Sequence, residues 1–132
     1  MTLKLLSSIF IVALLIAGCK KEAGFQTALV GTWKLAEQYD GYLMGGNYTW
    51  NKVPSNCSGK LTFGARGEYS AFSNNSGKTC TGNYDLLGSN ELQVTSSCNN
   101  AALVYSISAI TVNLLILDCK VREGVVRCKY TK

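Results

Sequence analysis

The stretch Leu61-Thr62-Phe63-Gly64-Ala65-Arg66-Gly67 contains the pattern that decides the fold. Apolar Leu61 and Phe63 flank a polar residue, which places both side chains on one face of an extended strand. Residues 64–67, with a glycine at each end, then favour a tight turn into a second strand. We therefore expect an antiparallel β-hairpin in this part of the chain.

The same unit, a short strand followed by turn residues, recurs along the chain. We expect strands at residues 30–39, 46–53, 59–64, 67–73, 80–87, 91–97, 102–110, 113–119 and 125–131. If the break near residue 111 is not a turn, nine strands become eight. Alternation gives the expected inward pairs: Tyr84 with Leu86, Leu92 with Val94, Tyr105 with Ile107, Leu115 with Leu117, and Val126 with Tyr130.

Consecutive strands joined by short loops must hide one face and protect their edges. Closing the sheet on itself achieves both. The sequence therefore predicts an all-β fold, a small up-and-down antiparallel β-barrel of about eight strands.

The N-terminal residues have the composition of an export signal. Lys4 is followed by the mostly apolar residues 5–16, and the small residues Ala17 and Gly18 precede Cys19. The apolar run is shorter than the about 20 residues that a membrane-spanning helix needs. An uncleaved helix, or an ordinary signal followed by a chance cysteine, is the alternative interpretation.

Ile16-Ala17-Gly18-Cys19 resembles the lipobox of bacterial lipoproteins, in which the cysteine sulfur receives diacylglycerol before cleavage. The resemblance implies a signal peptide at 1–18, a lipidated Cys19 with a short tether at 19–28, and a barrel domain at 29–132. It also implies a membrane partner, because more than one acyl chain on Cys19 gives a stable anchor. Lys20-Lys21-Glu22 is similar to the signal that sends many Bacteroidetes lipoproteins to the cell surface. We expect the outer membrane, either periplasmic or surface-facing.

Five cysteines follow the anchor, and an exported chain meets an oxidising compartment. Disulfides are therefore favoured over metal ligands, and zinc-type Cys-x-x-Cys pairs are absent from the sequence. A two-residue hairpin loop at Glu123-Gly124 would place Cys119 opposite Cys128 as a non-hydrogen-bonded pair. We expect a disulfide between these two residues.

A similar count around Ser89 places Cys80 opposite Cys98 and pairs the neighbouring apolar side chains as well. A Cys57–Cys80 bond is the competing arrangement. Because five is odd, one thiol is left over, and Cys57 in its loop is the candidate.

Leu29-Val30-Gly31-Thr32-Trp33-Lys34-Leu35 resembles the opening of lipocalin-like lipoproteins common in Bacteroidetes, where Gly-x-Trp begins the first barrel strand. The likeness continues in order to Tyr130. It implies a lipocalin-like barrel in which Gly31 allows a close approach at the barrel floor and Trp33 plugs that floor. Arg127, on the last strand, would then lie over the indole of Trp33 as a cation–π partner.

The composition excludes several function classes. Histidine is absent, so Ser-His-Asp and Cys-His catalysis and imidazole metal sites are impossible. The acidic residues show no matched pair for a two-carboxylate hydrolase, so we expect no enzymatic activity, no metal and no cofactor. The net charge of +5 is scattered rather than gathered in a stripe, which argues against nucleic-acid binding.

The preferred hypothesis is a non-enzymatic binding module that holds a small, partly apolar ligand in the barrel mouth. Its candidate lining is Tyr42, Met44, Tyr48 and Trp50, around the glycine-rich loop 40–47, with Tyr69 and Phe72 as second choices. The alternative interpretation is that these side chains only cover the core or the barrel rim, since a small barrel can be filled by its own side chains. The alternative function is a protein-binding lipoprotein, such as an envelope enzyme inhibitor or an assembly partner.

Overall fold

The computed structural model describes residues 20–42, 49–122 and 124–132. In this part of the chain, helix α2 (Lys20–Leu29) precedes a series of strands. The strands are β1 (Gly31–Tyr42), β2 (Asn51–Lys52), β3 (Gly59–Phe63), β4 (Glu68–Ser73), β5 (Lys78–Leu87), β6 (Glu91–Ser96), β7 (Leu103–Ile110), β8 (Leu114–Val121) and β9 (Gly124–Thr131).

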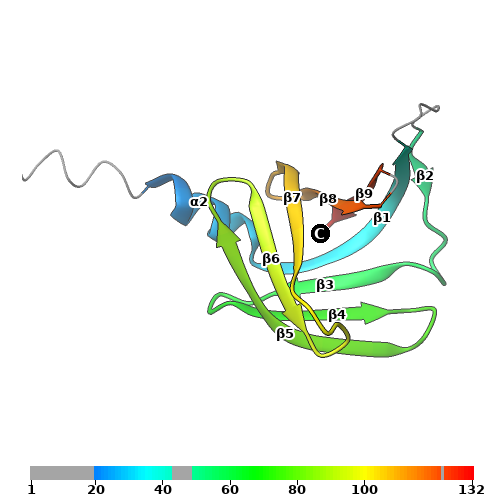
Figure 1. Ribbon diagram of the computed structural model, residues 1–132, viewed down its shortest axis with the longest axis horizontal. Helices are drawn as coiled ribbons and strands as arrows, with labels where there is room; N and C mark the ends of the chain where they lie inside the picture. Colours follow the sequence, from blue (N-terminus) through cyan, green and yellow to red (C-terminus); the bar gives the residue numbers. More distant parts are fainter. Residues whose placement is uncertain (1–19, 43–48, 123) are drawn as a thin grey trace, which may run out of the picture.

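The strands form one antiparallel sheet that closes into a barrel (Figure 1). From β3 to β9 each strand pairs with the next, and β9 pairs with β1, which also pairs with β3. An irregularity between Leu35 and Glu37 divides β1 into a half that lies along β3 and a half that lies along the short β2. The expected up-and-down all-β barrel of eight strands is confirmed, with β2 as an addition at the edge.

Most strand positions agree with the alternation in the sequence. The break near residue 111 is a turn, because β7 ends at Ile110 and β8 begins at Leu114. The expected strand at 46–53 is shortened to β2, and residues 43–48 lie outside the described part of the chain.

Large apolar side chains fill the half of the barrel next to α2. Trp33, Phe63, Leu92 and Leu115 are each at most 1% exposed. The ring of Phe63 packs against those of Tyr69 and Tyr84, with centroid separations of 5.5 and 5.1 Å. Burying a side chain of this size contributes about 1.5–3 kcal/mol, so this half of the interior is the hydrophobic core.

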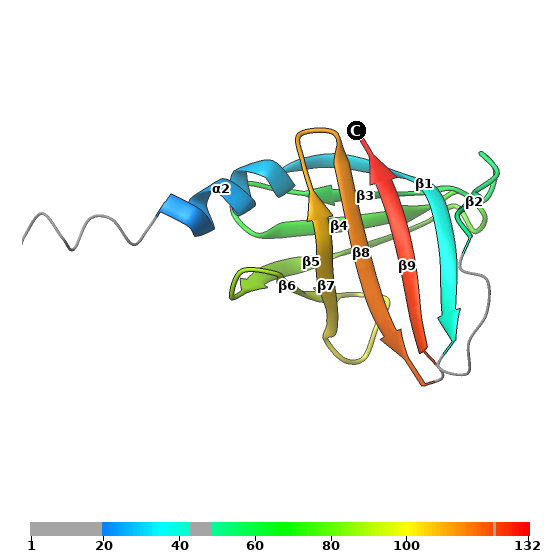
Figure 2. The same ribbon diagram turned by 90° about the horizontal axis from the view of Figure 1, so that it is seen from above.

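Residues 20–28, expected as a tether, belong to helix α2, which lies at one end of the barrel and projects away from it (Figures 1 and 2). Its last residue, Leu29, is fully buried, and the Leu29 carbonyl accepts a 2.7 Å hydrogen bond from Trp33 Nε1. Lys132 Nζ donates to the carbonyls of Ala28 and Val30 at 3.2 and 2.9 Å. Within the described residues, no helix has the length and apolar character needed to cross a membrane.

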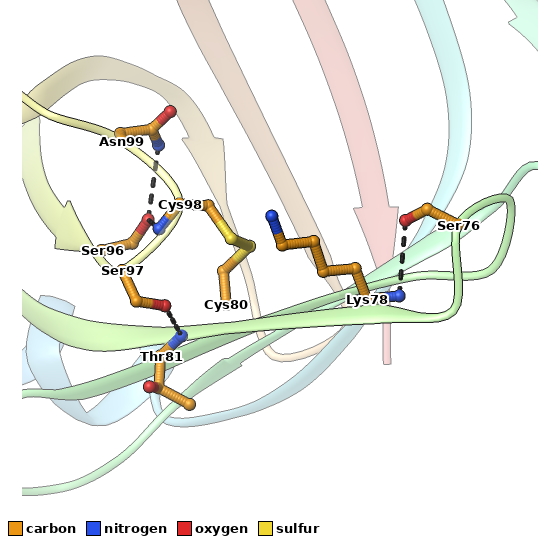
Figure 3. The surroundings of a disulfide bond; sticks show 8 residues. All are labelled: Ser76, Lys78, Cys80, Thr81, Ser96, Ser97, Cys98 and Asn99. Atoms are coloured by element: carbon orange, nitrogen blue, oxygen red, sulfur yellow. Dashed lines mark hydrogen bonds between the residues drawn. A yellow bond between two sulfur atoms is a disulfide. The ribbon is translucent and has the colours of Figure 1, made fainter.

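The Cys80–Cys98 disulfide is confirmed, with Cα atoms 5.5 Å apart (Figure 3). In Figure 3 the disulfide and the side chain of Lys78 lie on one side of β5, and the side chain of Thr81 lies on the other. Cys57 is exposed and outside any disulfide, as expected.

The expected Cys119–Cys128 disulfide is wrong. Val121 faces Gly124, so the hairpin loop is residues 122–123 rather than Glu123-Gly124. This moves the register by two residues, and Cys119 faces Val126 while Cys128 faces Leu117. Both cysteines keep the inward face but are diagonal neighbours, with a separation of about 7–8 Å in such pairs. That is beyond the span that a disulfide bridges without backbone movement.

Candidate ligand site in the barrel interior

The barrel has two different ends. The closed end carries α2 and the turns at 64–67, 88–90 and 111–113, and the mouth carries the turn at 74–77 and residues 97–102 and 122. Inward positions near the closed end hold the large side chains of the core. Toward the mouth, the register places mainly small side chains on the inward face: Ala71, Ser73, Cys80, Ser96, Cys119 and Cys128. Two longer polar residues share this face, Gln38 opposite Cys128 and Lys78 opposite Ser73.

This change in size follows from alternation along single strands. On β4, Tyr69 is buried beside Phe63, and the next inward residue is Ala71, which faces Leu61 and Cys80. Short side chains at facing positions cannot fill the middle of an eight-stranded barrel as large ones do. The packing of the core is therefore not continued to the mouth.

Inward residues toward the mouth are also less well covered than those of the core. Ala71, Cys80, Val126 and Cys128 are partly exposed, whereas Trp33 is fully buried. Solvent therefore reaches the inward face from this end. An inward face of this kind, reached from one end, could admit the apolar part of a small molecule.

A cluster of hydroxyl and thiol groups lies between the core and the mouth. We define this tyrosine–cysteine cluster as Tyr69, Tyr105, Tyr130, Cys119 and Cys128. Tyr105 faces Cys119 across β7 and β8, and the side chain of Tyr130 is hydrogen-bonded to that of Cys128. Among the described residues, no buried side-chain nitrogen or oxygen lacks a hydrogen-bond partner.

The phenols of the cluster are held in their neutral form. Burial, together with the neighbouring Tyr69, Cys119 and Cys128, raises the pKa of Tyr105 to about 12. Burial also raises the pKa of Tyr130 well above its usual value, and that of Tyr69 in the same direction. At neutral pH these groups are uncharged hydrogen-bond donors and acceptors set in an apolar wall.

The preferred lining residues are not in this interior where they are described. Trp50 packs edge-on against Tyr39, with ring centroids 4.5 Å apart, and Lys129 Nζ lies 4.1 Å from the Trp50 ring centroid. Lys129 belongs to the outward face of β9, where it pairs ionically with Glu37. Trp50 therefore covers the outside of the barrel, and its assignment to the mouth is corrected.

The side chains of the other three expected lining residues lie outside the described part of the structure. Tyr42 ends β1, and the structure describes its backbone, which faces Gly124, but not its side chain. Met44 and Tyr48 lie outside the described residues. Tyr105 and Tyr130 were expected to point inward but were not named as ligand contacts. Alternation identified their face, whereas their position at the edge of the core depends on the barrel's register.

Of the three residues expected as fold markers, Trp33 and Gly31 lie where the resemblance places them and Arg127 does not. Trp33 is fully buried at the closed end, as expected of a floor residue. Gly31 has a φ of +132°, and a Cβ there would lie 2.9 Å from Lys132 Cε, so the close approach is real. Lys132, not Arg127, lies over the Trp33 ring, with Nζ 4.5 Å from the centroid.

Arg127 is found on the outward face instead. It lies opposite Tyr39, with its guanidinium carbon 5.5 Å from that ring, and it bonds Asp118 at 2.5 Å. The reason is the register of β9: Thr131 faces Lys34, so it is the residue after Thr131 that reaches Trp33.

Comparison with known proteins supports the barrel but gives no named family. No family model matches the chain, and no curated protein matches it. A lipocalin-like protein from Bacteroides uniformis is similar in structure, with a TM-score of 0.58 and 22% identity, covering 80% of this chain and 98% of that one. The fold is lipocalin-like.

A second neighbour in structure is an uncharacterized protein from Bacteroides eggerthii, with a TM-score of 0.55 and 20% identity. It covers 79% of this chain and 99% of its own. The neighbours thus agree with the resemblance seen in the sequence. In the described part of the chain, no three or more Cys, Asp or Glu side chains are grouped so as to hold a metal ion.

Proposed function

We propose that this protein is a lipid-anchored envelope lipoprotein whose lipocalin-like barrel binds a small, largely apolar ligand through its mouth, without a catalytic step. The observation that supports it is the change from large to small inward side chains along the barrel. An interior packed only for stability gains from large side chains at every inward layer. Ala71 and Cys80, which face each other across β4 and β5, and Cys119 on β8 forgo that packing.

The chemistry of the wall defines the class of ligand. The apolar part of the ligand would lie among Leu61, Ala71 and Val126, on the partly exposed inward face. At its inner end it would meet the hydroxyls of Tyr105 and Tyr130, which donate to an uncharged acceptor such as a carbonyl or hydroxyl oxygen. A few placed polar groups in an apolar pocket are what orient small ligands.

The lipid anchor is supported by the sequence alone. Cys19 directly precedes α2, so the anchoring atom is separated from the folded chain by no further linker. Two acyl chains on this cysteine would hold the protein stably, because each buried methylene adds about 0.8 kcal/mol.

Filling the mouth tests the binding proposal. We would titrate chains starting at Lys20 with N-phenyl-1-naphthylamine, an uncharged apolar fluorophore, and compare Ala71→Phe with Thr81→Phe. Ala71 points inward, and Thr81, on the neighbouring strand, is exposed and points outward. We expect Ala71→Phe to weaken binding at least about tenfold, the effect of roughly 1.4 kcal/mol, and Thr81→Phe to leave it unchanged. Equal affinities, with both variants folded by circular dichroism, would refute the interior site.

A further inference from the structure

Helix α2 is fixed to the barrel and does not act as a flexible leash. Leu29, its last residue, is fully buried in the core, and its carbonyl is held by Trp33 Nε1 at 2.7 Å. Lys132 Nζ stabilises the same turn by donating a hydrogen bond to the carbonyl of Ala28. Breaking this junction would expose Leu29 and leave the Trp33 N–H without its partner, so the helix keeps its direction.

The direction of α2 separates the anchor from the mouth. The helix extends from the closed end, and the turn at 74–77 lies at the opposite end of the barrel (Figures 1 and 2). Ten residues of helix span about 15 Å at 1.5 Å per residue. An anchor on Cys19 is therefore about one short helix away from the closed end and the full barrel length farther from the mouth.

The surface around α2 carries apolar groups that a bilayer could cover. The β7–β8 turn presents Val112, which is 75% exposed, beside an apolar groove that it forms with Gly24, Thr27 and Ala28 of α2. Phe25 and Leu86, which also pack against the core, line a cleft of about 600 Å³ together with polar residues such as Arg66 and Asp85. Apolar side chains next to a lipid anchor gain by entering the interfacial region of a bilayer.

Charge contributes less to this surface. Arg66 and Lys132 lie at the closed end, but so do the carboxylates of Glu68 and Asp85. Positive and negative groups are therefore mixed, and the contact would be set by the anchor and the apolar groups. We expect little dependence on the fraction of anionic lipid.

We propose that the closed end docks on a phospholipid bilayer, with α2 and Val112 toward the lipid and the barrel mouth pointing away from it. This inference rests on the lipid anchor at Cys19 in the proposed function. Its consequence is that the ligand enters from the aqueous side and is not drawn directly from the bilayer that holds the protein.

Depth-dependent fluorescence tests this orientation. The full lipidated protein is placed in vesicles of phosphatidylcholine with phosphatidylglycerol, some lipids carrying a spin-labelled headgroup as quencher. A nitrobenzoxadiazole dye is joined by oxime chemistry to p-acetylphenylalanine at position 112 or 75, which leaves every cysteine native. Asn75 is exposed in the turn at the mouth and serves as the matched site. We expect quenching at position 112 to exceed that at 75 at least about threefold, and equal or reversed quenching would overturn the orientation.

A second variant separates the orientation from the anchor. Ten Gly and Ser residues inserted between Cys19 and Lys20 retain the lipid but lengthen the connection by a flexible segment. We expect this variant to float with vesicles as the parent does, while the ratio of quenching at position 112 to that at position 75 falls toward one. If the parent fails to float, the anchor itself is refuted and the orientation with it. If the insertion leaves the quenching difference intact, α2 is not what orients the barrel.

Discussion

The side chain of Trp33 contacts helix α2, the hydrophobic core and Lys132 near the end of the chain. Its ring is fully buried, its N–H bonds the Leu29 carbonyl, and Lys132 lies over its face. Trp33→Phe removes the hydrogen bond, leaves a buried carbonyl unpaired and opens a small cavity. We expect the free energy of unfolding to fall by about 2–4 kcal/mol. Urea denaturation followed by circular dichroism measures this loss.

Trp50 provides the matched control for that substitution. It is the same residue type on the outer face, where its ring contacts Tyr39 and Lys129. Trp50→Phe retains an aromatic ring there, so we expect a loss of less than about 1 kcal/mol. Similar losses for the two variants would show that the Trp33 junction is no more important to folding than a surface ring.

Asp118 gives a pH-dependent prediction. Burial by itself would raise the pKa of Asp118, but hydrogen bonds from Arg127 and Ser108 and the charge of Arg127 outweigh it, so the pKa is lowered. A lowered folded pKa contributes stability that is complete above the unfolded value, near 4, and is lost as the pH falls through the folded value. We expect Asp118→Asn to cost about 1–2 kcal/mol at pH 7 and progressively less below pH 4.

Chemical denaturation at pH 7, 4 and 3 measures this dependence. Asp85→Asn is the control, because Asp85 is exposed, and we expect it to change the unfolding free energy by less than about 0.5 kcal/mol. A cost for Asp118→Asn that is the same at all three pH values would contradict the role given to the Arg127 pair.

At the scale of single residues, the sequence predicted the position of Trp33 correctly but not the cation that lies over its ring. Trp33 was identified as the floor from the Gly-x-Trp pattern, and it is buried there. The cation over its ring was assigned to Arg127 and is Lys132. Choosing between Arg127 on β9 and Lys132 just after it needs the register of β9 against β1, which is set by long-range pairing.

At the scale of elements, the β8–β9 hairpin shows where local reasoning ends. A two-residue loop fits either residues 122–123 or 123–124, and the two registers keep every side chain on the same face. Alternation therefore cannot distinguish them. The structure takes the first, in which β9 also pairs with β1 along most of its length, from Gly124 opposite Tyr42 to Thr131 opposite Lys34. That pairing joins strands from the two ends of the domain, so the pattern of neighbouring residues gives no information about its register.

The register makes a prediction about thiols. With Cys119 and Cys128 diagonal and, among the described cysteines, only Cys80 joined to Cys98, a denatured chain that starts at Lys20 contains three thiols outside the disulfide, on Cys57, Cys119 and Cys128. We expect three equivalents in a thiol titration under non-reducing conditions. A single equivalent, which falls to zero in Cys57→Ser, would restore the disulfide between Cys119 and Cys128 and with it the alternative loop.

Helix α2 was missed for a related reason. Its sequence, KKEAGFQTAL, has no apolar stripe at helical spacing and contains Gly24. A short isolated helix of this kind is marginal in water, and tertiary contacts such as those of Leu29 decide it. The strands were predictable because alternation is recorded within each strand, whereas α2 depends on the barrel end against which it packs.

At the scale of the whole molecule, the two ends of the barrel have different compositions. The closed end holds the core and α2, and the inward face toward the mouth carries mainly small residues, with the longer polar Gln38 and Lys78. The sequence predicted the barrel and which residues point inward. It did not predict how large and small inward residues are sorted along the barrel axis, since that requires the stagger between strands. The ligand site was therefore sought in the loop 40–47 rather than in the wall.

Separation of anchor and barrel leads to a prediction for the whole protein. Cys19→Ala removes the sulfur that would carry diacylglycerol, so we expect incorporation of labelled palmitate to be lost and the precursor to keep residues 1–18. Cys57→Ser, which removes another thiol outside the disulfide, is the control and should be labelled as the parent is. Labelled-palmitate incorporation and the mobility of the chain on a denaturing gel measure both effects.

The same variant separates attachment from binding. Position 19 lies outside the barrel strands, which begin at Gly31. The Cys19→Ala chain, purified and freed of residues 1–18, should therefore bind N-phenyl-1-naphthylamine as the full lipidated protein does. Palmitate label that persists in Cys19→Ala would contradict the anchor. Loss of dye binding in that chain would instead show that the lipid, and not the barrel wall, forms part of the ligand site.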